Sequence, residues 1–257
     1  MDGRKYVTIW IGRAALVAAL ALLAAGHARA DVMVYATGFE SPEYGIGDLD
    51  GQQAWTADTD PAPNDCVVQG GIGIGGSQAV RIVADGNLPG IWWLGAQRDF
   101  VDPTPGNPVV SVSQMVRITS LNEAHYSLGM GGLNVGELAA SVFFLSSGAI
   151  WVNGIDTYFT WTAGAWKEVE VVLDYGAPNP TVTVYYDGLL VADEWYFYEP
   201  APGFCRLEVR TNDKVVTAAS SLCYDNLSIT ATPEPASALV LVAGLGGLAL
   251  ARRKARR

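Results

Sequence analysis

Residues 166–173 read WKEVEVVL, a stretch in which apolar and charged side chains alternate over most of its length. Successive side chains of a β-strand point to opposite faces of the sheet. Val169, Val171 and Leu173 therefore share one face, and the two glutamates between them share the other. The pattern predicts a strand with one face in the core and one face in water.

A second strand follows at once. Residues 181–188 read TVTVYYDG, in which alternating β-branched and aromatic residues lead into Asp187-Gly188. An Asp-Gly pair is a strong signal for a two-residue β-hairpin turn, because both positions favour a positive φ. A strand over 181–186 is therefore expected to begin a hairpin.

Runs of the same kind extend in both directions from this pair, separated by clusters of Gly, Pro, Asn and Asp. They cover residues 32–39, 78–83, 109–118, 141–145, 150–152, 206–211 and 222–230. Between Asp31 and Thr232 no sustained 3.6-residue apolar pattern is present. About 200 residues with ten or more short strands predict one all-β domain, a sandwich or a barrel.

The N-terminus has the form of a secretory signal peptide. Three basic residues precede the apolar run 14–25, and Ala28-Arg29-Ala30 has the small-x-small form of a signal-peptidase site. We expect residues 1–30 to be removed, so that the mature chain begins at Asp31. The run is too short for the alternative, an uncleaved anchor.

The C-terminus reads Pro233-Glu234-Pro235, then a charge-free apolar run 236–251, then five basic residues up to Arg257. Sixteen helical residues rise about 24 Å, just short of the ~30 Å hydrocarbon core, and the basic end would stay on the cytoplasmic side. The segment 233–257 resembles the PEP-CTERM sorting signal of Gram-negative bacteria. That resemblance implies processing by an exosortase-type membrane protease, an inner-membrane intermediate, and delivery to the cell surface or extracellular matrix. A plain transmembrane anchor is the alternative.

Removal of both ends leaves a strongly acidic body. Residues 31–232 contain 7 basic and 24 acidic side chains, a net charge of −17. Such a surface repels phosphate backbones and anionic headgroups, so nucleic acid is not expected as a partner.

The body resembles exported concanavalin A-like (laminin-G-like) domains along nearly its whole length. The similar pieces are Phe39-Glu40, then residues 47–55 (GDLDGQQAW), 166–169, 182–188 and 224–227 (YDNL). The resemblance implies a jelly-roll sandwich of two antiparallel sheets, often used to bind glycans and sometimes to cleave them. Extracellular polysaccharide is the partner that it suggests.

The carboxylates do not match the pattern expected of a glycosidase. Catalytic members of this sandwich class carry Glu-x-Asp-x-Glu on one strand, and glycosidases need two carboxylates that face one groove. Glu168 with Glu170, and Asp193-Glu194 with Glu199, are the nearest matches and fit poorly. We therefore interpret the domain as non-catalytic, either glycan-binding or structural in the envelope or exopolysaccharide matrix. A polysaccharide hydrolase or lyase of the same class is the alternative.

Two other motifs are weak. Residues 71–76 (GIGIGG) have the spacing of a dinucleotide-binding loop, but residues 78–83 favour a strand where that site needs a helix N-terminus. His125 is the one histidine left after signal removal, so a catalytic triad and a zinc cluster lose most of their support.

Aromatic pairs could stack on sugars. Trp92 and Trp93 are adjacent, so in a strand one ring points inward and the other outward, where it is a candidate glycan contact. Residues 195–198 (WYFY) could act in the same way. The alternative is that most of these rings belong to the core.

The resemblance also implies a structural calcium near the first and last strands, held by carboxylates and backbone carbonyls. Glu40 and Asp225 are the candidate ligands, because calcium prefers hard oxygen donors. The alternative is that Asp225 accepts hydrogen bonds from a neighbouring turn.

The three cysteines, in an oxidising compartment, suggest one disulfide. A hairpin folded about Lys214 would place Cys205 directly opposite Cys223, near disulfide range. We expect this bridge. A bridge from Cys66 to either partner is the rival.

Overall fold

The computed structural model describes residues 31–57, 65–84, 94–120, 125–134, 136–212 and 220–233. The expected signal peptide with Ala28 and Ala30, the pair Trp92 and Trp93, and nearly all of the C-terminal sorting segment lie outside these ranges. Among the described residues, no helix has the length and apolar character needed to cross a membrane.

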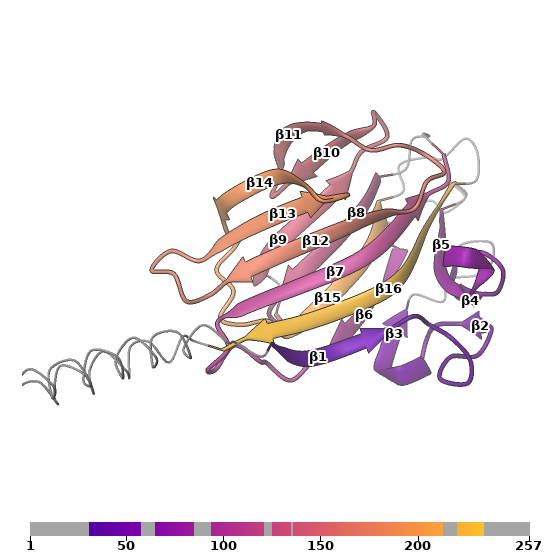
Figure 1. Ribbon diagram of the computed structural model, residues 1–257, viewed down its shortest axis with the longest axis horizontal. Helices are drawn as coiled ribbons and strands as arrows, with labels where there is room; N and C mark the ends of the chain where they lie inside the picture. Colours follow the sequence, from indigo (N-terminus) through magenta and orange to yellow (C-terminus); the bar gives the residue numbers. More distant parts are fainter. Residues whose placement is uncertain are drawn as a thin grey trace, which may run out of the picture. The chain divides into compact units, whose positions relative to one another are not determined.

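Residues 32–231 form an all-β unit with two antiparallel sheets (Figure 1). Sheet A has nine strands in the order β14-β13-β12-β7-β16-β5-β4-β2, with β1 also paired to β16, and sheet B has seven in the order β11-β10-β9-β8-β15-β6-β3. The bounds in sheet A are β1 Val32–Thr37, β2 Gly47–Asp48, β4 Asp65–Gln69, β5 Ala79–Ala84, β7 Val109–Ile118, β12 Lys167–Asp174, β13 Thr181–Tyr186, β14 Leu189–Tyr196 and β16 Ser220–Thr232. Those in sheet B are β3 Trp55–Ala57, β6 Leu94–Asp99, β8 His125–Gly131, β9 Leu138–Phe144, β10 Ala149–Val152, β11 Ile155–Thr160 and β15 Arg206–Asn212. Two short 3-10 turns, η1 Gln52–Ala54 and η2 Ile74–Gly76, complete the described elements.

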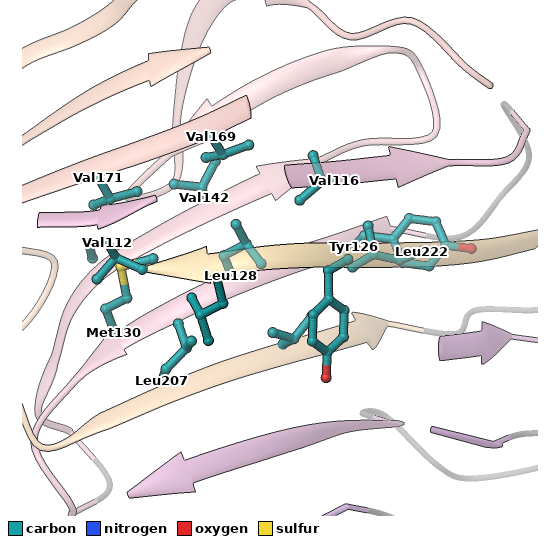
Figure 2. Packing of buried hydrophobic residues seen from close by; sticks show 14 of the residues in the cluster. Val112, Val116, Tyr126, Leu128, Met130, Val142, Val169, Val171, Leu207 and Leu222 are labelled. Carbon is teal, nitrogen blue, oxygen red and sulfur yellow. The ribbon is translucent and has the colours of Figure 1, made fainter. Parts of the chain in front are cut away.

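The expected all-β fold and the alternation of side chains are confirmed. In β12, Val169, Val171 and Leu173 are buried, and β7 alternates between buried and half-buried positions along all of its length. Side chains from the inner faces of both sheets join one apolar cluster, part of which Figure 2 shows. The two antiparallel sheets and the shared core agree with the jelly-roll sandwich that the resemblance implied.

Two local joins also agree with the sequence. Asp187 and Gly188 have φ values of 52° and 75°, the left-handed pair that a tight hairpin turn requires, and they connect β13 to β14. The Gly-rich stretch before β5 contains the turn η2 and leads into a strand, which removes the helix that a nucleotide site would need.

The first and last strands lie side by side, as expected. β16 is long enough to pair with two strands along one edge: β5 pairs with residues 220–224, and β1 pairs with residues 227–231. Figure 1 shows β16 running along β1 and past β5.

The expected hairpin between residues 206–211 and 222–230 is wrong. β15 lies in sheet B, where β6 and β8 use the hydrogen-bonding groups on both of its edges, whereas β16 lies in sheet A. No edge of β15 is left for β16, so Cys205 and Cys223 do not face each other, and both have free thiols in the structure. Cys66 lies on β4, opposite Ile82 of β5.

Leu128 tests how much the shared core contributes. It is 1% exposed at the centre of β8, opposite Val209 and Val142 in the neighbouring strands. Replacement by alanine should lower the free energy of unfolding by about 2–5 kcal/mol, because the cavity in a sheet-on-sheet core closes only in part. The matched control is Val101→Ala at a side chain that is 92% exposed, for which we expect a change within about 0.5 kcal/mol. Equal midpoints in urea for both variants would contradict this account of the core.

Candidate functional site

The outer face of sheet B carries a row of charged residues on β15. Leu207 and Val209 point into the core, so Arg206, Glu208 and Arg210 all project from the opposite face. Glu208 is the central member of the row, and its side chain is only 14% exposed. Packing of the two apolar residues therefore fixes the direction of all three charges.

Ion pairs hold the charged side chains together. Arg210 Nη2 lies 2.7 Å from Glu208 Oε1, and Arg206 Nη1 lies 4.0 Å from the same oxygen. Arg206 also donates two hydrogen bonds to Asp99 of β6, at 2.7 and 3.2 Å. The hydrogen bond to Asp99 raises the pKa of the Arg206 guanidinium above its ordinary value, so it stays cationic. One carboxylate thus lies between two guanidinium groups on a single face.

Glycines beside this row let neighbouring chain segments approach closely. In the strand register, Gly131 lies opposite Arg206, and Gly129 lies opposite Glu208. A Cβ atom at Gly131 would collide with the backbone carbonyl of Glu137, and one at Gly129 would press on Leu138 and Glu208. Gly131 forms part of the floor of a hollow of about 250 Å³, also lined by Arg206, Glu208 and Arg210, which we call the arginine groove.

The rim of the arginine groove contains Glu137, Tyr198 and Glu199. Hydrogen bonds from the side-chain and backbone nitrogens of Asn134 lower the pKa of the Glu137 carboxyl, so this exposed group is ionised at neutral pH. The Tyr198 phenol is 53% exposed. The rim therefore offers carboxylates and one phenol around a floor that carries two cations.

Further along the same face, the residues paired across neighbouring strands change from charged to aromatic. Arg210 pairs with Ser127 of β8, Ser127 with Phe143 of β9, and Phe143 with Trp151 of β10. Both rings are half-buried. The face thus combines a cationic part with an aromatic part, as a surface for sugars requires.

Glu40 and Asp225, the expected calcium ligands, lie near one another around Gly38. A Cβ atom at Gly38 would stand 3.7 Å from Glu40 Cγ, 3.9 Å from Asp225 Oδ1 and 3.4 Å from Asn226 Oδ1. Asp225 is buried, and its carboxylate accepts hydrogen bonds from the N–H groups of Ile74 and Asn226 at 3.1 and 2.8 Å. Within the described ranges, no group of three or more His, Cys, Asp or Glu side chains converges on one point. Calcium binding here stays a prediction.

Of the other residues named from the sequence, Tyr198 of the run 195–198 and Glu199 line this groove, and Glu168 and His125 do not. Glu168 lies on the outer face of sheet A and accepts a hydrogen bond from Ser113 Oγ at 2.6 Å. His125 begins β8, with its Nε2 3.4 Å from Ser146 Oγ. The sequence reasoning missed Arg206, Glu208 and Arg210, although three charges alternating with apolar residues in one strand were a visible signal.

Comparisons with known proteins support the fold. No protein-family model matches the chain, and no curated protein matches its sequence. Among solved structures, an endo-β-1,4-glucuronan lyase from the fungus Trichoderma reesei is similar with a TM-score of 0.54 and 10% identity, over 77% of this chain and 95% of that one. The alginate lyase vAL-1 from a Chlorella virus has a TM-score of 0.51 and 13% identity, over 73% and 98%. A sialidase is similar with a TM-score of 0.57 and 15% identity over 78% of this chain. The matched region is only 18% of the sialidase's length.

These comparisons contradict the prediction of a non-catalytic domain. Two proteins that share this fold over almost their whole length are polysaccharide lyases, so the fold gives no support to a non-catalytic domain. The prediction depended on the missing Glu-x-Asp-x-Glu motif, which concerns glycoside hydrolysis. Elimination chemistry has no need for that pair of carboxylates.

Asp225 provides a stability test for the Gly-rich loop. Its carboxylate joins β16 to the backbone N–H of Ile74, so Asp225→Ala leaves a donor without its acceptor. We expect a loss of about 1–3 kcal/mol in the free energy of unfolding. Asp193→Ala, at an exposed position of β14, is the control and should change stability little. Equal stability of the two variants would show that Asp225 does not hold this loop.

Proposed function

We propose that the protein is a polysaccharide lyase that acts on uronate-containing chains. The observation that carries this proposal is the pair Arg206 and Arg210, fixed by Glu208 over a glycine floor in a groove of about 250 Å³. Guanidinium groups recognise carboxylates well because their planar N–H donors match the two oxygens. The lyases among the similar folds support the choice.

The arginines would bind the carboxylate of the sugar whose C5–H bond breaks. Removal of the C5 proton places negative charge on that carboxylate, and cations already in position stabilise it at the transition state. Glu208 and Asp99 hold the guanidinium groups in place, so less reorganisation is needed during the reaction. Positioning and charge stabilisation are thus the roles of the charged row.

Proton transfer would fall to Tyr198, the phenol on the rim of the arginine groove. In the elimination, a base takes the C5 proton, the electron pair forms the C4–C5 double bond, and the C4–O4 bond breaks. The departing O4 receives a proton, so no proton is consumed in total. Tyr198 is the candidate for the group that exchanges these protons.

Glu137 is poorly suited to act as the general acid of a hydrolase. A hydrolase needs a carboxylic acid with a raised pKa to protonate the leaving oxygen. Hydrogen bonds from Asn134 lower the pKa of Glu137, which makes this rim carboxyl a poor general acid. The sequence features at both termini support action outside the cytoplasm, at the cell surface or in an exopolysaccharide matrix.

Removal of one arginine tests the proposal. Arg210→Ala should lower kcat/KM on polyglucuronate by about 100-fold or more, because a preorganised charge at the transition state is lost. The measurement is the ultraviolet absorbance of the unsaturated uronyl product. Lys167→Ala is the control, since this cation pairs with Asp187 on sheet A, and it should keep wild-type activity. Tyr198→Phe, which retains the ring, should also lose product formation. Absence of unsaturated product from the wild-type protein on every uronate polymer tested would refute a lyase.

We also propose that Glu40 and Asp225 hold a structural calcium that fixes the loop beside β16. Side-chain oxygens of Asp225 and Asn226 and the Glu40 Cγ lie around Gly38, and calcium would complete its coordination with backbone carbonyls. The ion would have no part in the elimination.

Calcium is tested by thermal unfolding. Millimolar calcium over a ~10 μM site stabilises the folded form by about 2.7 kcal/mol. In a domain of this size, the melting temperature should rise by a few degrees and fall again with a chelator. Glu40→Gln should remove most of this response. A melting curve that is the same with calcium and with chelator would exclude the site.

A further inference from the structure

The end of β14 and the segment after it present two tyrosines to solvent. Tyr196 is 71% exposed and Tyr198 is 53% exposed, whereas Phe197 between them points inward. The Phe197 ring packs edge-on against Tyr175, with 4.9 Å between the ring centroids. Tyr196 and Tyr198 line the same two hollows, so both phenol rings lie on the same outer side.

Hydrogen bonds from other elements hold this segment in place. Asn153 Nδ2 donates to the Tyr196 carbonyl at 2.9 Å, and the Tyr198 N–H donates to the Ala139 carbonyl at 3.0 Å. The Glu199 N–H donates to the Leu138 carbonyl at 2.9 Å. The rings are thus carried by a backbone tied to β9 and to the β10–β11 turn, which reduces the ordering cost of binding.

Two hollows lie against these rings and continue from the arginine groove. One, of about 680 Å³, is lined by Glu137, Tyr196, Tyr198 and Glu199 with prolines, and the other, of about 490 Å³, by Tyr196 and Tyr198 with Ile155. Tyr198 also lines the arginine groove, as do Glu137 and Glu199. Residues shared between neighbouring hollows give a polymer a continuous path from one to the next.

The charges of the two regions differ. The described residues that line the two tyrosine hollows include Glu137, Glu194 and Glu199 and no lysine or arginine. Glu137 and Glu199 also line the arginine groove, where Arg206 and Arg210 offset their charge, but no described cation does so in the tyrosine hollows. A uronate is therefore repelled in the tyrosine hollows, while exposed phenol rings stack on the apolar faces of uncharged sugars. Cations are present only in the part of this path formed by the arginine groove.

We propose that the tyrosine hollows are subsites for uncharged sugars, and that the ligand is a mixed polysaccharide in which a uronate is joined to neutral residues. This inference rests on the proposed function for the uronate subsite and adds the class of its neighbours. The glutamates argue against a protein partner on this surface, because the cores of protein interfaces are depleted of charged residues.

The test measures the affinity of the purified protein for three probes by calorimetry: xylohexaose, which is uncharged, a glucuronoxylan fragment with one uronate, and oligomannuronate, in which every sugar is charged. Tyr196 lines both tyrosine hollows but not the arginine groove. Tyr196→Ala should lower the affinity for xylohexaose and for the glucuronoxylan fragment about five- to tenfold, because one stacking contact is lost. The affinity for oligomannuronate should stay within about twofold of the wild-type value. Tyr158→Ala is the matched control, a tyrosine that is 92% exposed and lines none of these hollows.

The outcomes separate this inference from the lyase proposal. Arg210→Ala should lower the affinity for oligomannuronate and for the glucuronoxylan fragment, and should leave the affinity for xylohexaose unchanged. Unchanged binding of xylohexaose by Tyr196→Ala, no binding of xylohexaose by the wild type, or self-association that Tyr196→Ala abolishes would each overturn the neutral subsites. If Tyr196→Ala has no effect on binding but the wild type still forms unsaturated product, only the neutral subsites are refuted. If the wild type forms no product, xylohexaose binding still tests the neutral subsites.

Discussion

Mutual burial of the two sheets is the constraint from which the rest of the structure follows. Each sheet has one apolar face, and only the facing sheet can cover it. Because side chains alternate strictly along a strand, burial of Leu207 and Val209 also determines where Arg206, Glu208 and Arg210 point. A slip of one residue in β15 would place three charges in the core and remove the groove. The fold and the candidate site are thus two consequences of one register.

The charged row is a local exception in an acidic protein. Residues 31–232 have a net charge of −17, yet two of their seven basic residues lie on one strand of sheet B. Glu208 and Asp99 partly neutralise them, which limits the cost of bringing two guanidinium groups together. Contacts of this kind act over a few ångströms and depend little on the distant charges, because salt screens those beyond about 8–10 Å. The proposed uronate ligand would therefore meet cations where the average surface would repel it.

The sequence was a good guide to local structure and a poor one to partners in space. Alternation predicted β12, and Asp187-Gly188 predicted the turn between β13 and β14, because both signals depend on neighbouring residues. The pairing of residues 206–211 with 222–230 was wrong, since the choice between two sheets depends on which edges other strands already occupy. The arginine groove was missed for a related reason: its floor at Gly131 comes from a strand far away in the sequence. Of its lining, only Tyr198 and Glu199 were named from the sequence, the first as one of the aromatic residues that could stack on sugars and the second as part of an unrelated carboxylate motif.

The glutamates around the tyrosine hollows affect how a polymer arrives as well as where it stays. An anionic chain that diffuses toward this body meets a repulsive potential before it meets the arginines, and such potentials change encounter rates strongly with ionic strength. Added salt weakens the repulsion at long range more than the short contacts inside the groove. Capture of a charged polymer should thus become faster in saline surroundings, the reverse of the usual behaviour of proteins that attract their ligands electrostatically. An enzyme built in this way would be suited to a salty extracellular medium, where screening opens the approach to its own cationic strand.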